Sequence, residues 1–95
     1  MRLLIQVTQH DLDYSVRNSP HYSAVLCALR HRMYSKHLVV NHGVLRVEDN
    51  GFICVLPPHV QEYMKRYDKR EVTTPSNFFI QLPAYLVKPD IPEMN

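Results

Sequence analysis

The chain has 95 residues, of which 45% are hydrophobic and 21% charged, a length and composition typical of one globular domain and not of a disordered segment. Eleven Lys and Arg stand against nine Asp and Glu, so the net charge is only +2, whereas dedicated nucleic-acid-binding domains usually carry a stronger basic excess on one face. The N-terminal apolar run is too short for a signal peptide, and no segment approaches the ~20 apolar residues of a membrane span. We therefore expect a cytoplasmic protein that does not contact a membrane.

The first predicted elements are a strand and a short helix. Residues 2–7 read RLLIQV, and their apolar side chains recur at every second position, which predicts a strand. Thr8 follows and can cap a helix start, while Asp11, three residues later, suits the positive end of a helix. We expect one or two helical turns after Thr8.

A longer helix is predicted to begin at Ser19-Pro20. Serine can accept hydrogen bonds from the free N–H groups of a helix start, and proline fits the first helical position. An amphipathic helix of about 14 residues is expected from there, because apolar residues recur at steps of three and four. Its predicted stripe consists of Tyr22, Val25, Leu26, Leu29 and Met33.

The middle of the chain predicts a three-stranded antiparallel meander over residues 37–41, 44–49 and 52–56. Its apolar runs are separated by two turn sequences, Asn41-His42-Gly43 and Asp49-Asn50-Gly51. Asn-Gly is the strongest short hairpin signal, because both residues tolerate positive φ.

The last predicted elements are a helix opening at Pro57-Pro58 and a strand over residues 77–82. The helix stripe is Val60, Tyr63, Met64 and Tyr67. The expected fold is α+β, with one small mixed or antiparallel sheet of about five strands and two main helices on one face. Its sheet core is expected to include Val40, Val47, Phe52, Cys54, Phe78 and Ile80. We expect a single domain over residues 1–83 and an extended Pro-rich tail over residues 84–95.

No catalytic or metal-binding signature stands out in the sequence. Cys27 and Cys54 each lie inside an apolar run, which favours two buried thiols in a reducing cytosol, with a disulfide between helix and strand as the alternative. Six histidines are spread out without an H-x-x-x-H pair, although a zinc site from His31, His37 and His42 is a second interpretation. We therefore expect no enzyme activity, no cofactor and no metal.

Basic residues end both predicted helices and are the candidates for partner binding. The first cluster is Arg30, Arg32 and Lys36, with Tyr34 beside it, and the second is Lys65, Arg66, Lys69 and Arg70. One interpretation is that these cations only complement the negative ends of the helices. The other is a docking surface for an acidic protein or for nucleic-acid backbone, because Arg together with Tyr is typical of interfaces. Arg30 and Arg32 are expected to be exposed.

The order of motifs resembles a family of small phage and prophage proteins. The pattern is carried by LIQVTQHDLD, YSAVLCALR, VLPPHVQEYMKRYD and TPSNFFIQLP, and it covers residues 3–83. Two positions depart from it: Ser23-Ala24 replaces a Cys-Pro pair, and Lys69 replaces a small residue after the Tyr-Asp pair. Any chemistry that this cysteine performs in such proteins is therefore lost here.

The resemblance implies a small viral accessory protein without an established enzymatic activity. Such proteins commonly bind and block a host protein, including defence nucleases, so we expect an inhibitor of a host defence protein such as a CRISPR effector, an anti-CRISPR in function. The alternative is a regulator that binds nucleic acid directly through the basic helix ends. An exposed strand edge leaves a homodimer open as well.

Overall fold

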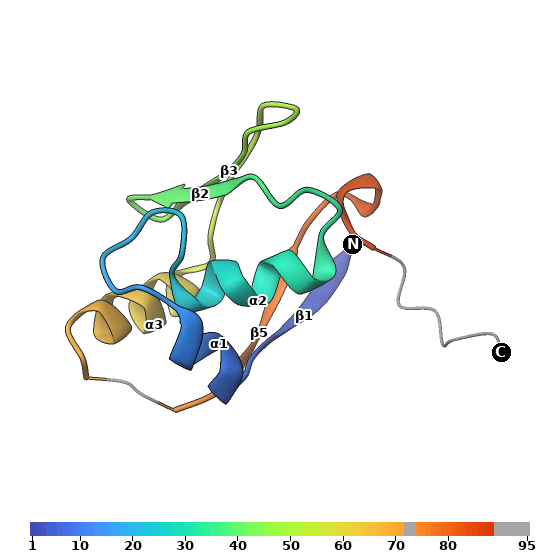
Figure 1. Cartoon of the computed structure of the whole chain (residues 1–95). Helices are drawn as coiled ribbons and strands as arrows, with labels where there is room; N and C mark the ends of the chain where they lie inside the picture. Colours follow the sequence, from blue (N-terminus) through green and yellow to red (C-terminus); the bar gives the residue numbers. More distant parts are fainter. Residues whose placement is uncertain (72–73, 89–95) are drawn as a thin grey trace, which may run out of the picture.

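The computed structural model describes residues 1–71 and 74–88 of the chain (Figure 1). Its elements, in chain order, are β1 (Arg2–Val7), α1 (Gln9–Tyr14), α2 (Ala24–Arg32), β2 (Leu38–Asn41), β3 (Val44–Val47), β4 (Phe52–Val55), α3 (Pro58–Asp68), β5 (Ser76–Gln81) and the 3-10 turn η1 (Ala84–Leu86). The α+β class and the five strands agree with the sequence-based prediction, and every predicted strand and helix is present.

The five strands form two antiparallel sheets and not one. β1 pairs with β5, while β2, β3 and β4 form the predicted meander. Figure 1 shows α2 between the two sheets, and α2 contacts both β1 and β2. No strand pairing joins the sheets within the described residues. The expected arrangement was a single sheet with helices on one face. The structure instead has two sheets and a central helix, α2, with an apolar surface toward each of them.

The core lies around α2. Val25, Leu26 and Leu29 are at most 1% exposed, and they pack with apolar residues from both sheets and from α3. Among the expected sheet contributors, Val40, Val47, Phe78 and Ile80 are buried. Phe52 and Cys54 are only partly buried and pack against the edge of this core.

The prediction that the long helix begins at Ser19 is wrong, because α2 begins at Ala24. Ser19 Oγ accepts hydrogen bonds from the N–H groups of His21 (3.2 Å) and Tyr22 (3.1 Å), which builds a local turn. The Pro20 carbonyl accepts from Val40 N–H at 2.9 Å, so this segment pairs with β2. Tyr22 consequently lies outside the helix and is 58% exposed.

In the two turns of the meander, the residues with positive φ are not the Asn-Gly pair that was expected. His42 and Gly43 have φ values of 52° and 77° and make the tight turn between β2 and β3, the combination that two-residue hairpins require. In the second turn only Gly51 has a positive φ, and Asn50 Oδ1 accepts from Phe52 N–H at 2.9 Å.

The expected boundary after residue 83 does not hold for residues 84–88. Leu86 and Val87 are buried, Val87 forms a β-bridge with Met33, and Tyr34 N–H donates to the Leu86 carbonyl at 3.1 Å. The buried side chains of Leu86 and Val87 stabilise this contact. The three prolines nearby in the sequence had instead favoured an extended tail. The rest of the predicted tail, residues 89–95, lies outside the described residues.

Candidate functional site

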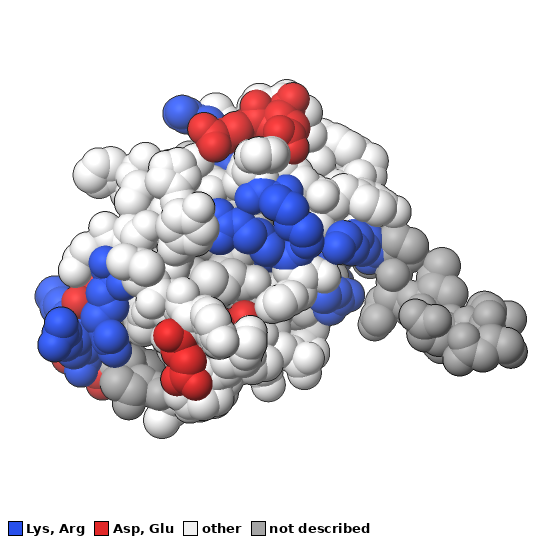
Figure 2. Space-filling view, viewed as in Figure 1, with Lys and Arg blue, Asp and Glu red and all other residues white. Residues whose placement is uncertain are grey.

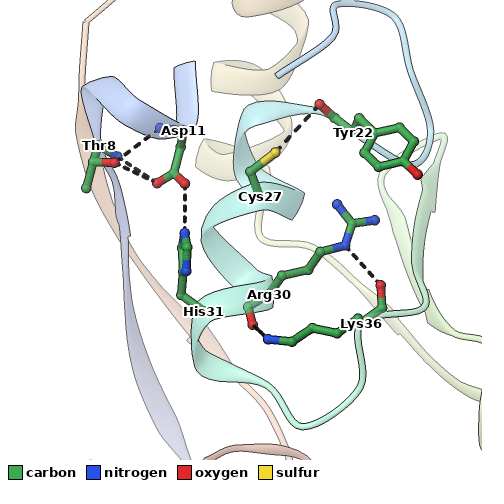
Figure 3. A network of polar contacts seen from close by, with 7 residues as sticks. All are labelled: Thr8, Asp11, Tyr22, Cys27, Arg30, His31 and Lys36. Carbon is green, nitrogen blue, oxygen red and sulfur yellow. Dashed lines mark hydrogen bonds and ion pairs between the residues drawn. The ribbon is translucent and has the colours of Figure 1, made fainter. Parts of the chain in front are cut away.

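Arg30 lies at the last turn of α2 and ties the following loop to the helix (Figure 3). Its Nε donates to the Lys36 carbonyl at 2.9 Å, and the guanidinium also donates to the carbonyls of His21 and Leu38. The guanidinium carbon lies 5.1 Å from the centre of the Tyr22 ring, within cation–π range. Arg30 is therefore a structural clamp that is half-buried.

The prediction that Arg30 and Arg32 are both exposed is wrong. Arg32 is also half-buried, and its Nη1 donates to the Leu4 carbonyl of β1 at 3.0 Å. The carbonyls that accept from these arginines lie in loops and on strands, and one long guanidinium can reach several of them. These two arginines thus have a role in holding the fold.

Lys36 belongs to a group of three neighbouring cations with Arg30 and Lys88. The Lys36 ammonium donates to the Arg30 carbonyl, as Figure 3 shows. Burial lowers the pKa of Lys36, and the nearby Lys88 and Arg30 lower it further. Within the described part of the chain none of the three forms an ion pair with a carboxylate. Sequence reasoning missed Lys88 because it placed this residue in a tail.

Three exposed tyrosines accompany these cations. Tyr22, Tyr34 and Tyr85 are 58%, 60% and 67% exposed. Tyr22 stacks with Arg30, and the bond from Tyr34 N–H to the Leu86 carbonyl brings the Tyr85 segment to the same helix end. We call this set the α2-end surface, and it consists of Tyr22, Arg30, Tyr34, Lys36, Tyr85 and Lys88.

The second predicted basic cluster lies at the end of α3 and is exposed. Figure 2 shows it apart from the cations around the end of α2, with uncharged surface between the two groups. Arg66 Nε lies 3.9 Å from a carboxylate oxygen of Glu71, and Arg70, two residues beyond the end of α3, has a φ of 63°. The two predicted clusters therefore do not form one continuous basic patch on this face. Acidic side chains next to the second cluster lower its net positive charge.

A cavity of about 450 Å³ lies at the opposite end of α2, a volume in the range of small-molecule sites. Its walls come from the loop before α2, from the β2–β3 turn and from one side of α3. The lining residues are Asn18, Ser19, Pro20, Ser23, Val40, Asn41, His42, Gly43, Gln61, Met64, Lys65 and Asp68. No local sequence pattern predicts this cavity, because three separate segments of the chain form it.

A buried carboxylate links α1 to α2. Asp11 is 1% exposed, and its Oδ1 lies 3.1 Å from Nε2 of His31 on α2 (Figure 3). Thr8 and Asp11 form a complete capping box at the start of α1. The polar group is therefore satisfied within the described chain, and its geometry is that of a structural tie between two helices.

The two cysteines are free and only partly buried, where full burial was expected. Burial raises the pKa of Cys27 and of Cys54, which disfavours the thiolate that nucleophilic chemistry needs. Cys27 Sγ lies 3.8 Å from the Tyr22 carbonyl and points toward it (Figure 3). His31 follows Cys27 by one helical turn but contacts Asp11 instead.

Within residues 1–71 and 74–88, no group of three His, Cys, Asp or Glu side chains could hold a metal ion. None of the described helices combines the length and the apolar character needed to cross a membrane. Comparisons with protein-family models, with curated proteins and with solved structures found no match to this chain.

Proposed function

We propose that this chain is a small phage-type accessory protein that acts in the host cytoplasm by binding and blocking a host defence protein, such as a CRISPR effector. The α2-end surface is the observation that supports binding: three cations without a carboxylate partner in the described chain, beside three exposed tyrosines. The phage setting is supported only by the order of motifs over residues 3–83.

The charge of this surface defines the chemistry of the partner. Lys88 lies close enough to Lys36 to disfavour the charged form of Lys36. An acidic side chain that docks between them would relieve this repulsion, and so gains more than it would against an isolated lysine. The partner surface is therefore acidic.

The tyrosines add contact area to this surface, and the ring of one of them, Tyr22, is already held in place. Tyrosine presents an apolar ring with a polar hydroxyl, and it is enriched where interfaces derive most of their binding energy. Arg30 holds the Tyr22 ring from one side while its own donors are bound to backbone carbonyls. Less conformational entropy is lost on binding when such groups are fixed in advance.

A protein partner fits this surface better than nucleic acid does. Binding along a phosphate backbone favours a continuous basic face, whereas the two basic groups of this chain stay apart in Figure 2. The cluster at the end of α3 also lies beside Glu71. A compact cationic patch with tyrosines around it suits an acidic protein surface.

The test uses a double reversal, Lys36→Glu with Lys88→Glu, and Lys69→Glu as the matched control in the other cluster. The tagged chain is used to isolate partners from nuclease-treated host lysate, and binding is then measured with the purified partner. We expect affinity to fall at least about tenfold in the double variant and to stay unchanged in the control. Equal binding by all three proteins, with circular dichroism showing them folded, rejects this surface.

A second measurement separates protein binding from nucleic-acid binding. Duplex DNA is titrated with the chain at increasing salt, because phosphate contacts give a log–log slope near −0.9 for each contact. We expect no binding that depends on Lys36 and Lys88. DNA binding with a steep salt slope that the double variant abolishes would overturn the protein-binding proposal in favour of nucleic acid.

A further inference from the structure

The cavity at the N-terminal end of α2 contains a buried polar group without a partner. Ser23 is 3% exposed and lines this cavity. Its hydroxyl is the one buried side-chain polar atom without a hydrogen bond among residues 1–71 and 74–88. Buried hydroxyls are almost always hydrogen-bonded, and leaving one unpaired costs free energy. The unpaired hydroxyl therefore indicates that the cavity binds a ligand with a polar group.

The same position is the start of a nine-residue helix. Ser23 is the N-cap of α2, yet its side chain does not accept a hydrogen bond from the first turn. The first N–H groups of a helix have no partner inside it, and together with the helix dipole they favour an anion. A ligand with a negatively charged group is thus favoured at this end of the cavity.

The wall formed by α3 supplies a cation and further polar groups. Gln61, Met64, Lys65 and Asp68 follow the spacing i, i+3, i+4 and i+7, so they lie on one side of the helix and all line the cavity. Lys65 is exposed and can turn toward an anion. Asp68 Oδ1 accepts from Asn18 N–H at 2.8 Å, which fixes this carboxylate in the wall.

The β2–β3 turn closes the cavity from a third direction. Gly43 lies against Gln61 so closely that a Cβ atom would overlap the carboxamide. Gln61 is fixed in turn, because its Nε2 donates to the Leu56 carbonyl at 2.7 Å. These contacts shape the cavity before any ligand binds, which lowers the entropic cost of binding.

We propose that this cavity binds a small phosphorylated polyol, such as a sugar phosphate, with the phosphate group at Ser23 and the start of α2. The Ser23 hydroxyl donates to a phosphate oxygen, and Lys65 neutralises part of the charge. The carboxylate of Asp68 disfavours a ligand that is anionic throughout, and it favours hydroxyl groups on the remainder. None of the residues of the α2-end surface lines this cavity, although Tyr22 precedes Ser23 in the sequence, so this site does not depend on that surface.

The first experiment titrates the ¹⁵N-labelled chain with inorganic phosphate, with ribose 5-phosphate and, at matched ionic strength, with sodium chloride. We expect saturable amide shifts at Ala24, Val25 and Leu26 with both phosphates, and tighter binding of the sugar phosphate. Shifts at these amides that fail to saturate, or that chloride reproduces, would overturn the site. Equal affinity for both phosphates would overturn the polyol part of the proposal.

Two variants with a matched control locate the binding. Ser23→Ala should weaken ribose 5-phosphate binding about tenfold, because it removes a hydrogen bond to a charged group. Lys65→Gln should weaken it as well, whereas Lys69→Gln, an exposed lysine at the same helix end that does not line the cavity, should leave it unchanged. Equal effects of the two lysine substitutions would indicate unspecific attraction and contradict the proposal.

Discussion

The two helices α1 and α2 both begin at a hydroxyl residue, but only the first is capped. At α1, Thr8 Oγ1 accepts from Asp11 N–H at 3.2 Å, and Asp11 Oδ2 accepts from Thr8 N–H at 2.9 Å. At α2, the Ser23 hydroxyl is buried and forms no bond with the described residues. The polar groups at the start of α1 bond to one another and only stabilise the fold. The start of α2 lies at a cavity, and its hydroxyl is available to a ligand.

The largest effect on stability is expected for Asp11→Ala, which removes the capping box at the start of α1. The substitution removes a buried carboxylate that holds the cap and contacts His31, so the free energy of unfolding should fall by about 2–3 kcal/mol. Urea unfolding followed by circular dichroism measures it. Asp13→Ala is the matched control: Asp13 is exposed on the same helix and should change stability by less than ~0.5 kcal/mol. Equal losses in both variants would mean that the capping box contributes little.

Thr8→Ala removes the other half of the same cap. It should lower the free energy of unfolding by about 1 kcal/mol, the usual value for an N-cap hydroxyl. Thr8→Ser keeps the hydroxyl and should retain most of this stability in the same unfolding measurement. A serine variant as unstable as the alanine variant would show that the methyl group matters and the hydrogen bond does not.

The equivalent substitution at α2 should change stability in the opposite direction. Ser23→Ala removes a buried hydroxyl without a partner, so without ligand the free energy of unfolding should rise by about 0.5–1 kcal/mol. Thermal unfolding of the unliganded chain, compared directly with Thr8→Ala, gives the sign. A loss of stability like that of Thr8→Ala would show that Ser23 caps its helix in solution, and the contrast between the two starts would disappear.

The smallest effect is expected for His31→Ala, which tests whether the capping box of α1 depends on its link to α2. The His31 side chain is 64% exposed, and pairs of this kind contribute little. We expect a loss of about 0.5 kcal/mol in urea unfolding, since Thr8 still satisfies Asp11. A loss approaching that of Asp11→Ala would instead make the α1–α2 contact the main stabilising interaction.

Local patterns predicted the elements of the fold because they depend on neighbouring residues. The capping box, the meander and the Pro58 helix start all follow from residues within a few positions of each other. The start of α2 could not be predicted in this way. Ser19 and Ser23 are both acceptable caps in the sequence, and the bond from Val40 N–H to the Pro20 carbonyl decides between them.

The candidate sites depended even more on long-range contacts. Residues 30, 34 and 36 were identified from sequence, but the clamp role of Arg30 depends on carbonyls that only the folded loop brings to it. Lys88 joins the surface because of the Met33–Val87 bridge. The cavity beside Ser23 is formed where three segments of the chain meet. No single stretch of sequence therefore contains a pattern that predicts it.

The pairing of β1 with β5 also has a consequence for how this chain is synthesised. Arg2 pairs with Gln81 and Val7 with Ser76, so β1 is synthesised well before the strand with which it pairs. The meander, whose strands are neighbours in sequence, can form early, but the ladder between β1 and β5 forms late because it must close a long loop. Until then β1 has an unpaired apolar edge, and this is the interval in which the nascent chain is most exposed to aggregation.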